Sequence, residues 1–395
     1  MKIALIQLND KAVYEGYRRN VTKRTPLGLA YVAAWYINQG HEVDIIDASL
    51  DDLNENQIVY ETLRIDPELI GISCTTPLFM QLIKVTKLIK HLRPDKIIKI
   101  GGPHVTALPN ESLQRSGADS ICSGEVEKYD NLDYIPFPAR HLLRCDDYVD
   151  YARGVLTPQT SVITSRGCVG RCGFCSAGGS KVRFRSVKNV ISELEEIKYK
   201  YGIDNIVFYD DSFTMDKQRV IQLCKEMKRL ELNYQVQLRL DQIDEEIMDW
   251  LVQSGCQQVG PGIESGNREI LESIGKRETP EFMLEKCKMI KKYPVKMRCS
   301  FIMGWIDETE EQILETIELA KKIEADENAF SIATPYPGTR MWEVAMERGL
   351  VSADMDFSEF LYYHKVGCNL SRVFSERLLE LHELAYKEMG NYALR

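Results

Sequence analysis

Residues 165–179 read SRGCVGRCGFCSAGG and place Cys168, Cys172 and Cys175 in the spacing CxxxCxxC. Three such thiolates suit a cubic four-iron four-sulfur (4Fe-4S) cluster, which takes four ligands, and they leave one iron open to another group. Structural zinc requires four closed ligands, and no histidine or fourth cysteine stands nearby to complete them. We therefore predict an iron–sulfur cluster with an open iron at these three cysteines.

The cysteine stretch belongs to the first of six strand-like segments that alternate with helical patterns. The segments are SVITSRGC (161–168), NIVFYDDSF (205–213), NYQVQLRL (233–240), QQVGPGIES (257–265), KMRCSFIMGW (296–305) and AFSIATPYPGT (329–339). Six strand–helix repeats favour a partial (β/α)6 barrel of the TIM type, because eight would be needed to close it. We expect this barrel over residues 159–345, with its chemistry at the carboxyl ends of the strands.

A second alternation precedes the barrel and predicts an α/β domain over residues 1–126. Its apolar runs are KIALIQL (2–8), EVDIIDA (42–48), LIGISCTT (69–76), KIIKIGGP (96–103) and DSICSG (119–124). Short strands separated by helices imply right-handed crossovers and a Rossmann-like, doubly wound parallel sheet. Pro136 and Pro138 indicate a surface linker over 127–158, and an amphipathic pattern after residue 371 indicates a helical extension over 346–395.

Composition narrows the class of partner. The net charge of −9 argues against a nucleic-acid groove, which needs a basic surface, so we expect a small-molecule substrate. No apolar run reaches about 18 residues, which argues against a membrane span, and no targeting segment is recognisable. We therefore expect a cytoplasmic protein in which the other eight cysteines are buried core residues.

The motifs together resemble the radical S-adenosylmethionine (SAM) superfamily, whose cysteine loop carries an aromatic residue before the last cysteine, here Phe174. The resemblance implies that SAM chelates the open iron, that an external donor such as flavodoxin or ferredoxin supplies one electron, and that a 5'-deoxyadenosyl radical abstracts hydrogen from the substrate. It implies SAM contacts at these positions: Phe174, Gly178, Gly179, Asp211, Arg239, Glu264 and Ser265.

Simpler structural roles remain open for several of these residues. The glycines could form an ordinary turn, Asp211 could cap a helix, and Arg239 could form a surface ion pair. Tyr336 is the one candidate catalytic residue, although an aromatic ring between two prolines also suits packing. IDET after Trp305 departs from the proline and glycine that are usual in the family and predicts one reshaped loop.

The amino-terminal domain resembles that of the cobalamin-binding subgroup, the class B-like methyltransferases. The resemblance implies that cobalamin lies beyond the carboxyl ends of its strands, on these candidates: Thr25, Pro26, Gly28, Ser73, Thr75, Thr76, Gly101, Gly102, His104, Gly124 and Glu125. DxHxxG is absent, so no histidine ligand to cobalt is expected, and His104 could equally cap a loop. SGEVEKYDNLDYIPFPAR (123–140) joins sheet and linker so directly that a helix covering the sheet edge is expected to be missing.

These features favour a radical SAM enzyme with cobalamin-dependent methyl transfer to carbon. The alternative is a cobalamin-independent dehydration, epimerisation, cyclisation or ring rearrangement with a relic Rossmann domain. A non-catalytic iron–sulfur or corrinoid carrier would leave Arg239 and Glu264 without a role. A transfer-RNA methylthiotransferase would need an RNA-binding domain and further amino-terminal cysteines that the sequence lacks.

Overall fold

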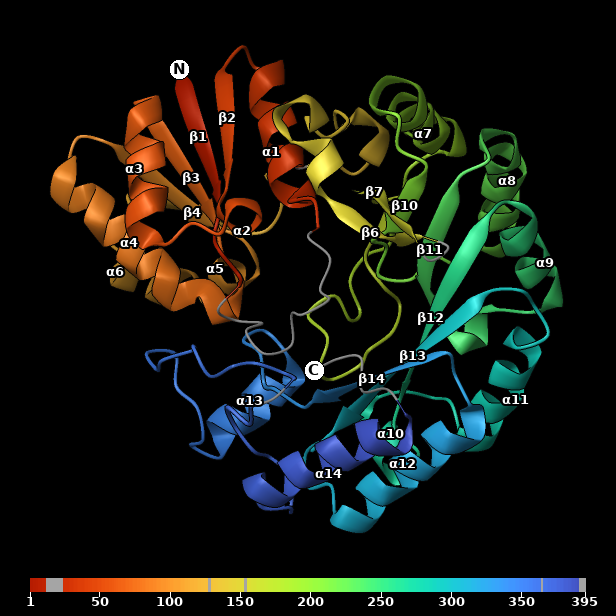
Figure 1. Cartoon of the computed structure of the whole chain (residues 1–395). Helices are drawn as coiled ribbons and strands as arrows, with labels where there is room; N and C mark the ends of the chain where they lie inside the picture. Colours follow the sequence, from red (N-terminus) through yellow and green to blue (C-terminus); the bar gives the residue numbers. More distant parts are fainter. Residues whose placement is uncertain (12–23, 127–128, 153–154, 364, 391–395) are drawn as a thin grey trace.

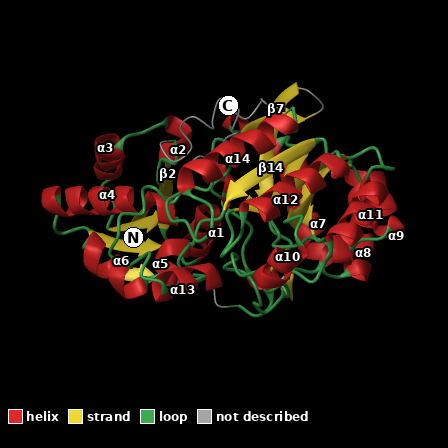
Figure 2. Ribbon diagram, turned by 90° about the horizontal axis from the view of Figure 1, so that it is seen from below, coloured by secondary structure: helices red, strands yellow, loops and turns green. Residues whose placement is uncertain are grey.

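The computed structural model describes residues 1–11, 24–126, 129–152, 155–363 and 365–390. Two α/β units lie side by side around a central region that the loop after residue 165 enters (Figure 1). Seen from below, helices line the outside of both units, and the sheets lie inside them (Figure 2). Among the described residues no helix is long and apolar enough to cross a membrane.

The first unit is the predicted doubly wound sheet. In the described part of the chain its strands are β1 (Lys2–Gln7), β2 (Glu42–Asp47), β3 (Leu69–Ser73), β4 (Ile97–Gly101) and β5 (Ser120–Cys122). Their order is β2-β1-β3-β4-β5, and every neighbouring pair is parallel. The apolar runs are continuous because helices cover both faces. The chain reverses its direction of winding between β1 and β3, which is where such sheets bind ligands.

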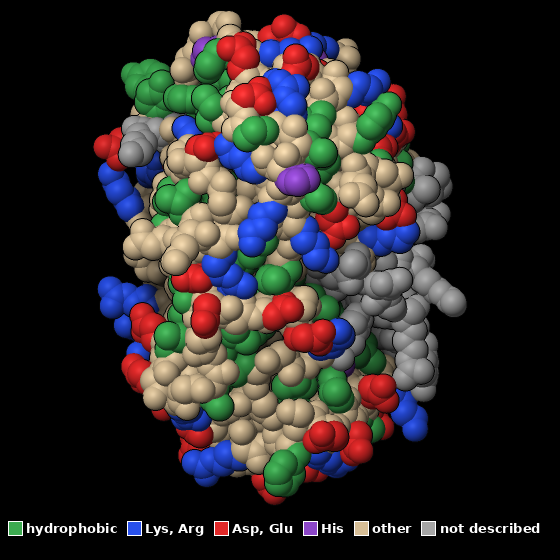
Figure 3. Space-filling model, turned by 90° about the vertical axis from the view of Figure 1, so that its left-hand side faces the viewer, with side chains coloured by type: hydrophobic (Ala, Val, Ile, Leu, Met, Phe, Trp, Pro, Cys, Tyr) green, Lys and Arg blue, Asp and Glu red, His purple; other side chains and the backbone are tan. Residues whose placement is uncertain are grey.

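Helices flank this sheet on its two faces, with α1 on one side and α3 and α4 on the other (Figure 1). The helices are α1 (Leu27–Asn38), α2 (Ala48–Asp51), α3 (Glu55–Ile65), α4 (Phe79–Leu92), α5 (Pro103–Ala107) and α6 (Pro109–Ser116). Basic and acidic side chains are interspersed on the outer face of this unit, with no broad basic area in that view (Figure 3).

The second unit is the predicted partial barrel. Its parallel strands, as far as the chain is described, are β7 (Val155–Val162), β10 (Asn205–Phe208), β11 (Asn233–Leu238), β12 (Cys256–Glu264), β13 (Lys296–Met303) and β14 (Glu327–Ile332). Two short strands, β8 (Ser165–Arg166) and β9 (Arg183–Phe184), pair antiparallel beside it. The helices are α7 (Val187–Tyr201), α8 (Lys217–Met227), α9 (Glu245–Gln253), α10 (Arg268–Ile274), α11 (Pro280–Ile290), α12 (Glu310–Ile323) and α13 (Arg340–Glu347).

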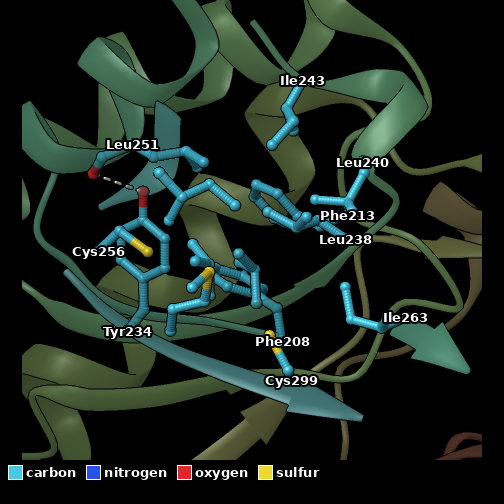
Figure 4. Packing of buried hydrophobic residues seen from close by; sticks show 14 of the residues in the cluster. Phe208, Phe213, Tyr234, Leu238, Leu240, Ile243, Leu251, Cys256, Ile263 and Cys299 are labelled. Carbon is cyan, nitrogen blue, oxygen red and sulfur yellow. Dashed lines mark hydrogen bonds between the residues drawn. The ribbon is translucent and has the colours of Figure 1, made fainter. Parts of the chain in front are cut away.

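The barrel core lies between the strands and these helices. Phe208, Phe213 and Tyr234 form an aromatic group in it, with ring centroids 4.9 to 6.5 Å apart. The Tyr234 hydroxyl donates to the Leu251 carbonyl at 3.1 Å, so this buried polar atom is paired (Figure 4). Tyr234, Val236 and Leu238 of β11 are buried on the helix side, so the intervening residues of the strand face the inside of the barrel. Arg239 follows the strand directly.

The interpretation of 127–158 as a surface linker needs correction. Leu132, Ile135 and Tyr148 are buried, and β6 (Val149–Ala152) pairs antiparallel with β7 to extend the barrel sheet. The buried Arg140 forms an ion pair with Glu193 of α7. Apolar side chains and a paired charge hold the segment in place, although its prolines exclude a long helix.

The carboxyl-terminal extension contains the expected helix, α14 (Ser375–Glu388), which packs on β14 and α12. The segment between α13 and α14 also contacts the first unit. Phe357 is fully buried against Phe79 of α4, and Arg115 of α6 donates to the Met355 carbonyl at 3.0 Å. This segment therefore joins the two units.

The IDET departure is accommodated by a buried carboxylate. Glu308 accepts hydrogen bonds from the backbone N–H groups of Gly304 and Trp305 at 2.6 and 2.9 Å, and burial raises its pKa to about 7. The Glu308 carboxylate thus closes the turn at Gly304 and Trp305. Gly304 has φ +84°, and an added Cβ would lie 2.7 Å from Leu378 of α14, so the turn packs directly on that helix.

Candidate active site

The cysteine loop is fixed at its beginning by hydrogen bonds from its own backbone. Gly167 N–H donates to Asp211 Oδ2 at 2.8 Å, and Cys168 N–H donates to Ser180 Oγ at 3.2 Å. Asp211, which follows β10, therefore holds the loop against the barrel. Its predicted contact with SAM stays a prediction.

The middle of the loop is held by main-chain bonds to two barrel helices. Gly173 N–H donates to the Ile274 carbonyl at 2.7 Å, and Met341 N–H donates to the Gly173 carbonyl at 3.0 Å. An added Cβ at Gly173 would lie 3.2 Å from the Trp305 ring, which also meets Phe174 edge to face. The loop is thus seated on α10, α13 and the β13 turn.

The three thiols are partly or fully shielded from water. Burial raises the pKa of Cys172 and Cys175, and each of these thiols is close enough to another cysteine of the loop for their charges to interact. Among the described residues no three His, Cys, Asp or Glu side chains converge as at a single metal ion. In a cubic cluster each cysteine binds a different iron, so the three thiols need not converge on one point and the loop suits such a cluster. The positive irons would offset the free-energy cost of burying three negatively charged thiolates.

Glycines let other groups approach the cysteines closely. A Cβ at Gly170 would lie 2.9 Å from Arg239 Nη1 and 3.4 Å from Cys168 Sγ. Gly178 is enclosed by three carbonyl oxygens at 3.3 to 3.5 Å from its Cβ position, and Gly179 has φ +72°. Arg239, which directly follows β11, therefore lies beside the cysteine loop, and its predicted contact with SAM stays a prediction.

Five charged residues contact one another in succession near the carboxyl ends of the strands. Arg239 binds Asp241 through two hydrogen bonds of 3.0 and 2.8 Å, and the Asp241 N–H donates to Glu278 Oε1 at 3.1 Å. Lys276 Nζ lies 3.4 Å from Glu278 Oε2 and 3.5 Å from Glu264 Oε1. Three carboxylates and two cations leave one negative charge, which complements a cationic ligand such as SAM.

Glu264 occupies a constrained position at the end of β12. Its backbone has φ +70°, and the pairing of β12 with β13 shifts register between Gly262 and Glu264. Burial raises the pKa of Glu264, while the Lys276 ammonium opposes that rise. The carboxylate is close enough to Cys172 to raise the pKa of that thiol. The end of β12 therefore holds a buried carboxylate that is paired with Lys276 and lies near enough to Cys172 for their charges to interact.

Two of the predicted residues point their side chains into protein. The fully buried Ser265 hydroxyl lies 3.2 Å from Thr316 Oγ1 of α12. The Tyr336 hydroxyl donates to the Phe360 carbonyl at 2.8 Å, and its ring meets that of Phe360. These contacts fit packing, and a catalytic role for Tyr336 stays a prediction.

A pocket of about 320 Å³ opens between the sheet of the first unit, α1 and the barrel. Six of the predicted cobalamin residues line it: Gly28, Ser73, Gly101, Gly102, Gly124 and Glu125. Ile163 and Arg166 line it from the barrel side. No α-helix follows β5 in the described residues before β6, as the short connection predicted. The pocket therefore runs along the sheet from Leu69 at the start of β3 to the carboxyl ends of β3 and β4, where Arg166 lines it at the root of the cysteine loop.

The glycines at the end of β4 are required by close backbone contacts. Gly102 has φ +98°, and an added Cβ would lie 2.6 Å from the Cys74 carbonyl oxygen. At Gly101 the Cβ would lie 3.3 Å from the Cys122 carbonyl oxygen. The chain's own packing thus requires these glycines, and because both also line the pocket, no side chain from them narrows it, so the residues present fit cobalamin.

The remaining cobalamin candidates lie around this edge without lining the pocket. Pro26 precedes α1, Thr25 is buried, and Thr75 is exposed. His104 and Thr76 are buried in the core, where His104 Nδ1 lies 3.2 Å from Thr76 Oγ1. The side chains of His104 and Thr76 are therefore turned toward protein.

The buried His104 predicts a loss of stability in acid. Burial lowers its pKa to about 4 from an ordinary value of 6.5, so the folded chain binds the proton less readily than the unfolded chain. The stability that this group contributes is fully present above pH 6.5 and is lost as the pH falls toward 4, by about 3 kcal/mol. Urea unfolding at pH 7.5 and pH 5 should show that the free energy of unfolding falls less in His104→Gln than in the wild type. An equal fall in both proteins would mean that His104 is not the source of the acid sensitivity.

Filling the pocket should remove cobalamin without removing iron. Gly28 lines the pocket from α1, and an added Cβ there meets nothing within 4 Å. Gly28→Trp should weaken cobalamin binding by about tenfold or more, because an overfilled site costs roughly 1–3 kcal/mol. Gly28→Ala is the matched control and should bind normally. Equilibrium dialysis with hydroxocobalamin checks this, and wild-type binding by Gly28→Trp would place the cofactor elsewhere.

Several residues that lie around the cysteine loop, Arg239 and Glu264 were not predicted from the sequence. They are Gly170, Ser180, Asp241, Lys276 and Glu278. Asp241 could have been suspected because it follows Arg239 in LRLD. KRE at 276–278 carries only the signal of three charges in a short link between helices, which is an ordinary surface pattern.

A cobalamin-type sheet that faces a partial barrel with a CxxxCxxC loop defines the class as a radical SAM enzyme with a corrinoid domain. Residues 162–320 match the Radical SAM superfamily model, and residues 21–131 match the B12 binding domain model. The chain is 34% identical to an uncharacterized methyltransferase of Pyrococcus horikoshii over 98% of this chain and 92% of that protein.

Two further proteins are similar to the chain over most of its length. The chain is 24% identical to the cytidylyl-2-hydroxyethylphosphonate methyltransferase of Streptomyces wedmorensis over 91% of this chain and 84% of that protein. The fold matches the radical SAM methyltransferase TsrM of Kitasatospora setae, solved with cobalamin and a [4Fe-4S] cluster, with a TM-score of 0.72, 17% identity and coverage of 100% and 91% of the two chains. The chain belongs to the cobalamin-binding radical SAM methyltransferase family. Its cofactors are the 4Fe-4S cluster, SAM and cobalamin.

Proposed function

We propose that this enzyme transfers a methyl group to an unactivated carbon of a small-molecule substrate after a 5'-deoxyadenosyl radical has removed hydrogen from that carbon. The observation that supports it best is the 320 Å³ pocket whose lining comes from both units, beside the root of the cysteine loop. When bound, the cluster supplies an electron to SAM and cobalamin carries the methyl group. Each turnover consumes two molecules of SAM and two electrons.

The residues of this chain would bind and orient SAM. Cys168, Cys172 and Cys175 would hold the cluster, with the fourth iron left for the methionine end of SAM. Arg239 lies beside Gly170 of the loop, where its guanidinium would bind the SAM carboxylate. Glu264, held by Lys276, would accept a hydrogen bond from the amine or the ribose.

The electrons would come from an external one-electron donor of the flavodoxin or ferredoxin type. The loop offers such a donor an approach, since Val169 beside Cys168 is 64% exposed. The exposed apolar side chain next to a cluster ligand would allow a redox partner to come within transfer distance of the irons.

The products distinguish methyl transfer from a cobalamin-independent rearrangement. Incubation of the holoenzyme with SAM, a low-potential reductant and a candidate methyl acceptor should release S-adenosylhomocysteine, 5'-deoxyadenosine and methionine together. Protein prepared without cobalamin should release no S-adenosylhomocysteine. Equal product formation with and without cobalamin, with 5'-deoxyadenosine alone, would support the rearrangement instead.

A further inference from the structure

The root of the cysteine loop carries two arginines side by side. Arg166 of β8 and Arg183 of β9 are direct partners in the antiparallel register. Like charges that face each other across two strands repel, and such short strands have little pairing to offset the repulsion. A carboxylate between the two guanidinium groups would remove this cost.

Glu125 supplies that carboxylate from the other unit. It follows β5 by three residues, its Oε2 lies 2.9 Å from Arg166 Nη1, and its Oε1 is bonded to Arg183 Nη2. Arg183 also donates to the Tyr129 carbonyl at 2.8 Å. The side chains of Arg166 and Arg183 are each 18% exposed and that of Glu125 is 35% exposed, so solvent screens these ion pairs less than pairs between fully exposed side chains.

The same contacts border the cofactor pocket. Glu125 and Arg166 both line it, and the Arg166 guanidinium lies 5.4 Å from the centre of the Tyr31 ring on α1. Arg183 does not line the pocket, although it binds the same carboxylate. One carboxylate thus connects the edge of the sheet, the wall of the pocket and both strands from which the cysteine loop emerges.

We propose that Glu125 is a positioning residue, which fixes the root of the cysteine loop against the edge of the cobalamin domain through Arg166 and Arg183. It was expected from the sequence to contact cobalamin, whereas here its carboxylate is bonded to the barrel. The inference rests on the proposed function insofar as the spacing between the two cofactor sites governs methyl transfer. Formation of 5'-deoxyadenosine requires only groups held by the barrel, so it should not depend on Glu125.

Product partitioning in the holoenzyme tests this role. With SAM, titanium(III) citrate and hydroxocobalamin, Glu125→Ala and Arg183→Ala should each lower the rate of S-adenosylhomocysteine release by about 10- to 100-fold, as small misplacements do. Release of 5'-deoxyadenosine should stay within about twofold. The double variant should be no worse than Glu125→Ala, because Glu125→Ala already removes the ion pair with Arg183. The swap E125R/R183E should restore much of the rate.

Hydrogen–deuterium exchange gives a second readout that does not depend on turnover. Glu125→Ala should speed exchange at the root of the loop, in β8 (Ser165–Arg166) and β9 (Arg183–Phe184), whereas Glu195→Ala, which removes the exposed pair with Arg229, should leave both strands unchanged. Wild-type exchange of β8 and β9 in Glu125→Ala would overturn the proposal.

The outcomes separate this inference from the proposed function. Wild-type S-adenosylhomocysteine release by Arg183→Ala, with cobalamin lost from Glu125→Ala alone, would overturn it and make Glu125 a direct cofactor contact. If the wild type releases no S-adenosylhomocysteine, the proposed function fails, and the exchange experiment still decides whether Glu125 holds the loop.

Discussion

Cys172→Ala is expected to yield a folded protein that has lost its cluster and forms no 5'-deoxyadenosine. Cys172 is the middle ligand of the loop, and its backbone carbonyl accepts the Cys175 N–H at 3.0 Å, a bond that the substitution retains. Two remaining thiolates cannot hold a cube that keeps one iron open for SAM. Iron and sulfide analysis after anaerobic reconstitution, together with the visible spectrum, measures the loss.

A cysteine outside the loop provides the control for this substitution. Cys368 is buried in the segment that joins the two units, far along the sequence from the loop. Cys368→Ala should keep a full complement of iron and form 5'-deoxyadenosine, at a cost in stability only. A stable cluster in Cys172→Ala would mean that the three cysteines are not the ligands.

Glu264→Gln is expected to lower kcat/KM for SAM by about 10- to 100-fold, the size of a lost hydrogen bond to a charged group. The substitution removes the charge that Lys276 holds at the barrel mouth, and leaves the buried ammonium with Glu278 alone. Cluster content should be unchanged, since Glu264 is not a ligand. Equilibrium binding of SAM to the reconstituted enzyme, followed by the change in the cluster's EPR signal, checks this directly.

Substitutions of Lys276 test whether its ammonium group keeps the Glu264 carboxylate charged. Lys276→Met should also weaken SAM binding, because Glu264 loses its buried counter-ion and its carboxylate becomes harder to keep charged. Lys276→Arg keeps the charge and should recover part of the affinity. If Glu264→Gln binds SAM as the wild type does, the carboxylate plays no part in the SAM site.

The strands of both units were predictable because each is a short apolar run bounded by turn residues. The runs KIALIQ in β1 and NIVF in β10 have this form, and parallel pairing followed from the helices between strands. The stretch from 127 to 158 was misread because its prolines and polar residues hide isolated anchors. Tyr148 is one of them, and its hydroxyl donates to Asp47 at 2.8 Å across 101 positions of sequence.

In the candidate active site, too, residues in local motifs were predictable and residues defined by distant contacts were not. Cys168, Arg239 and Glu264 stand at strand ends in recognisable motifs, and the structure brings them together at the mouth of the barrel. Lys276 was not found in this way, and Glu125 was found but expected to contact cobalamin, because the partners of both residues are supplied only by the tertiary structure. Residues buried as ion pairs look like ordinary surface charges in a sequence.

The most direct test of the account is a count of metals in the chain purified anaerobically with hydroxocobalamin present and reconstituted with iron and sulfide. The account predicts about four irons and about one cobalt per chain, with cobalt lost from Gly28→Trp and iron lost from Cys172→Ala, each without the other. Cluster iron with no cobalt in the wild type would contradict it.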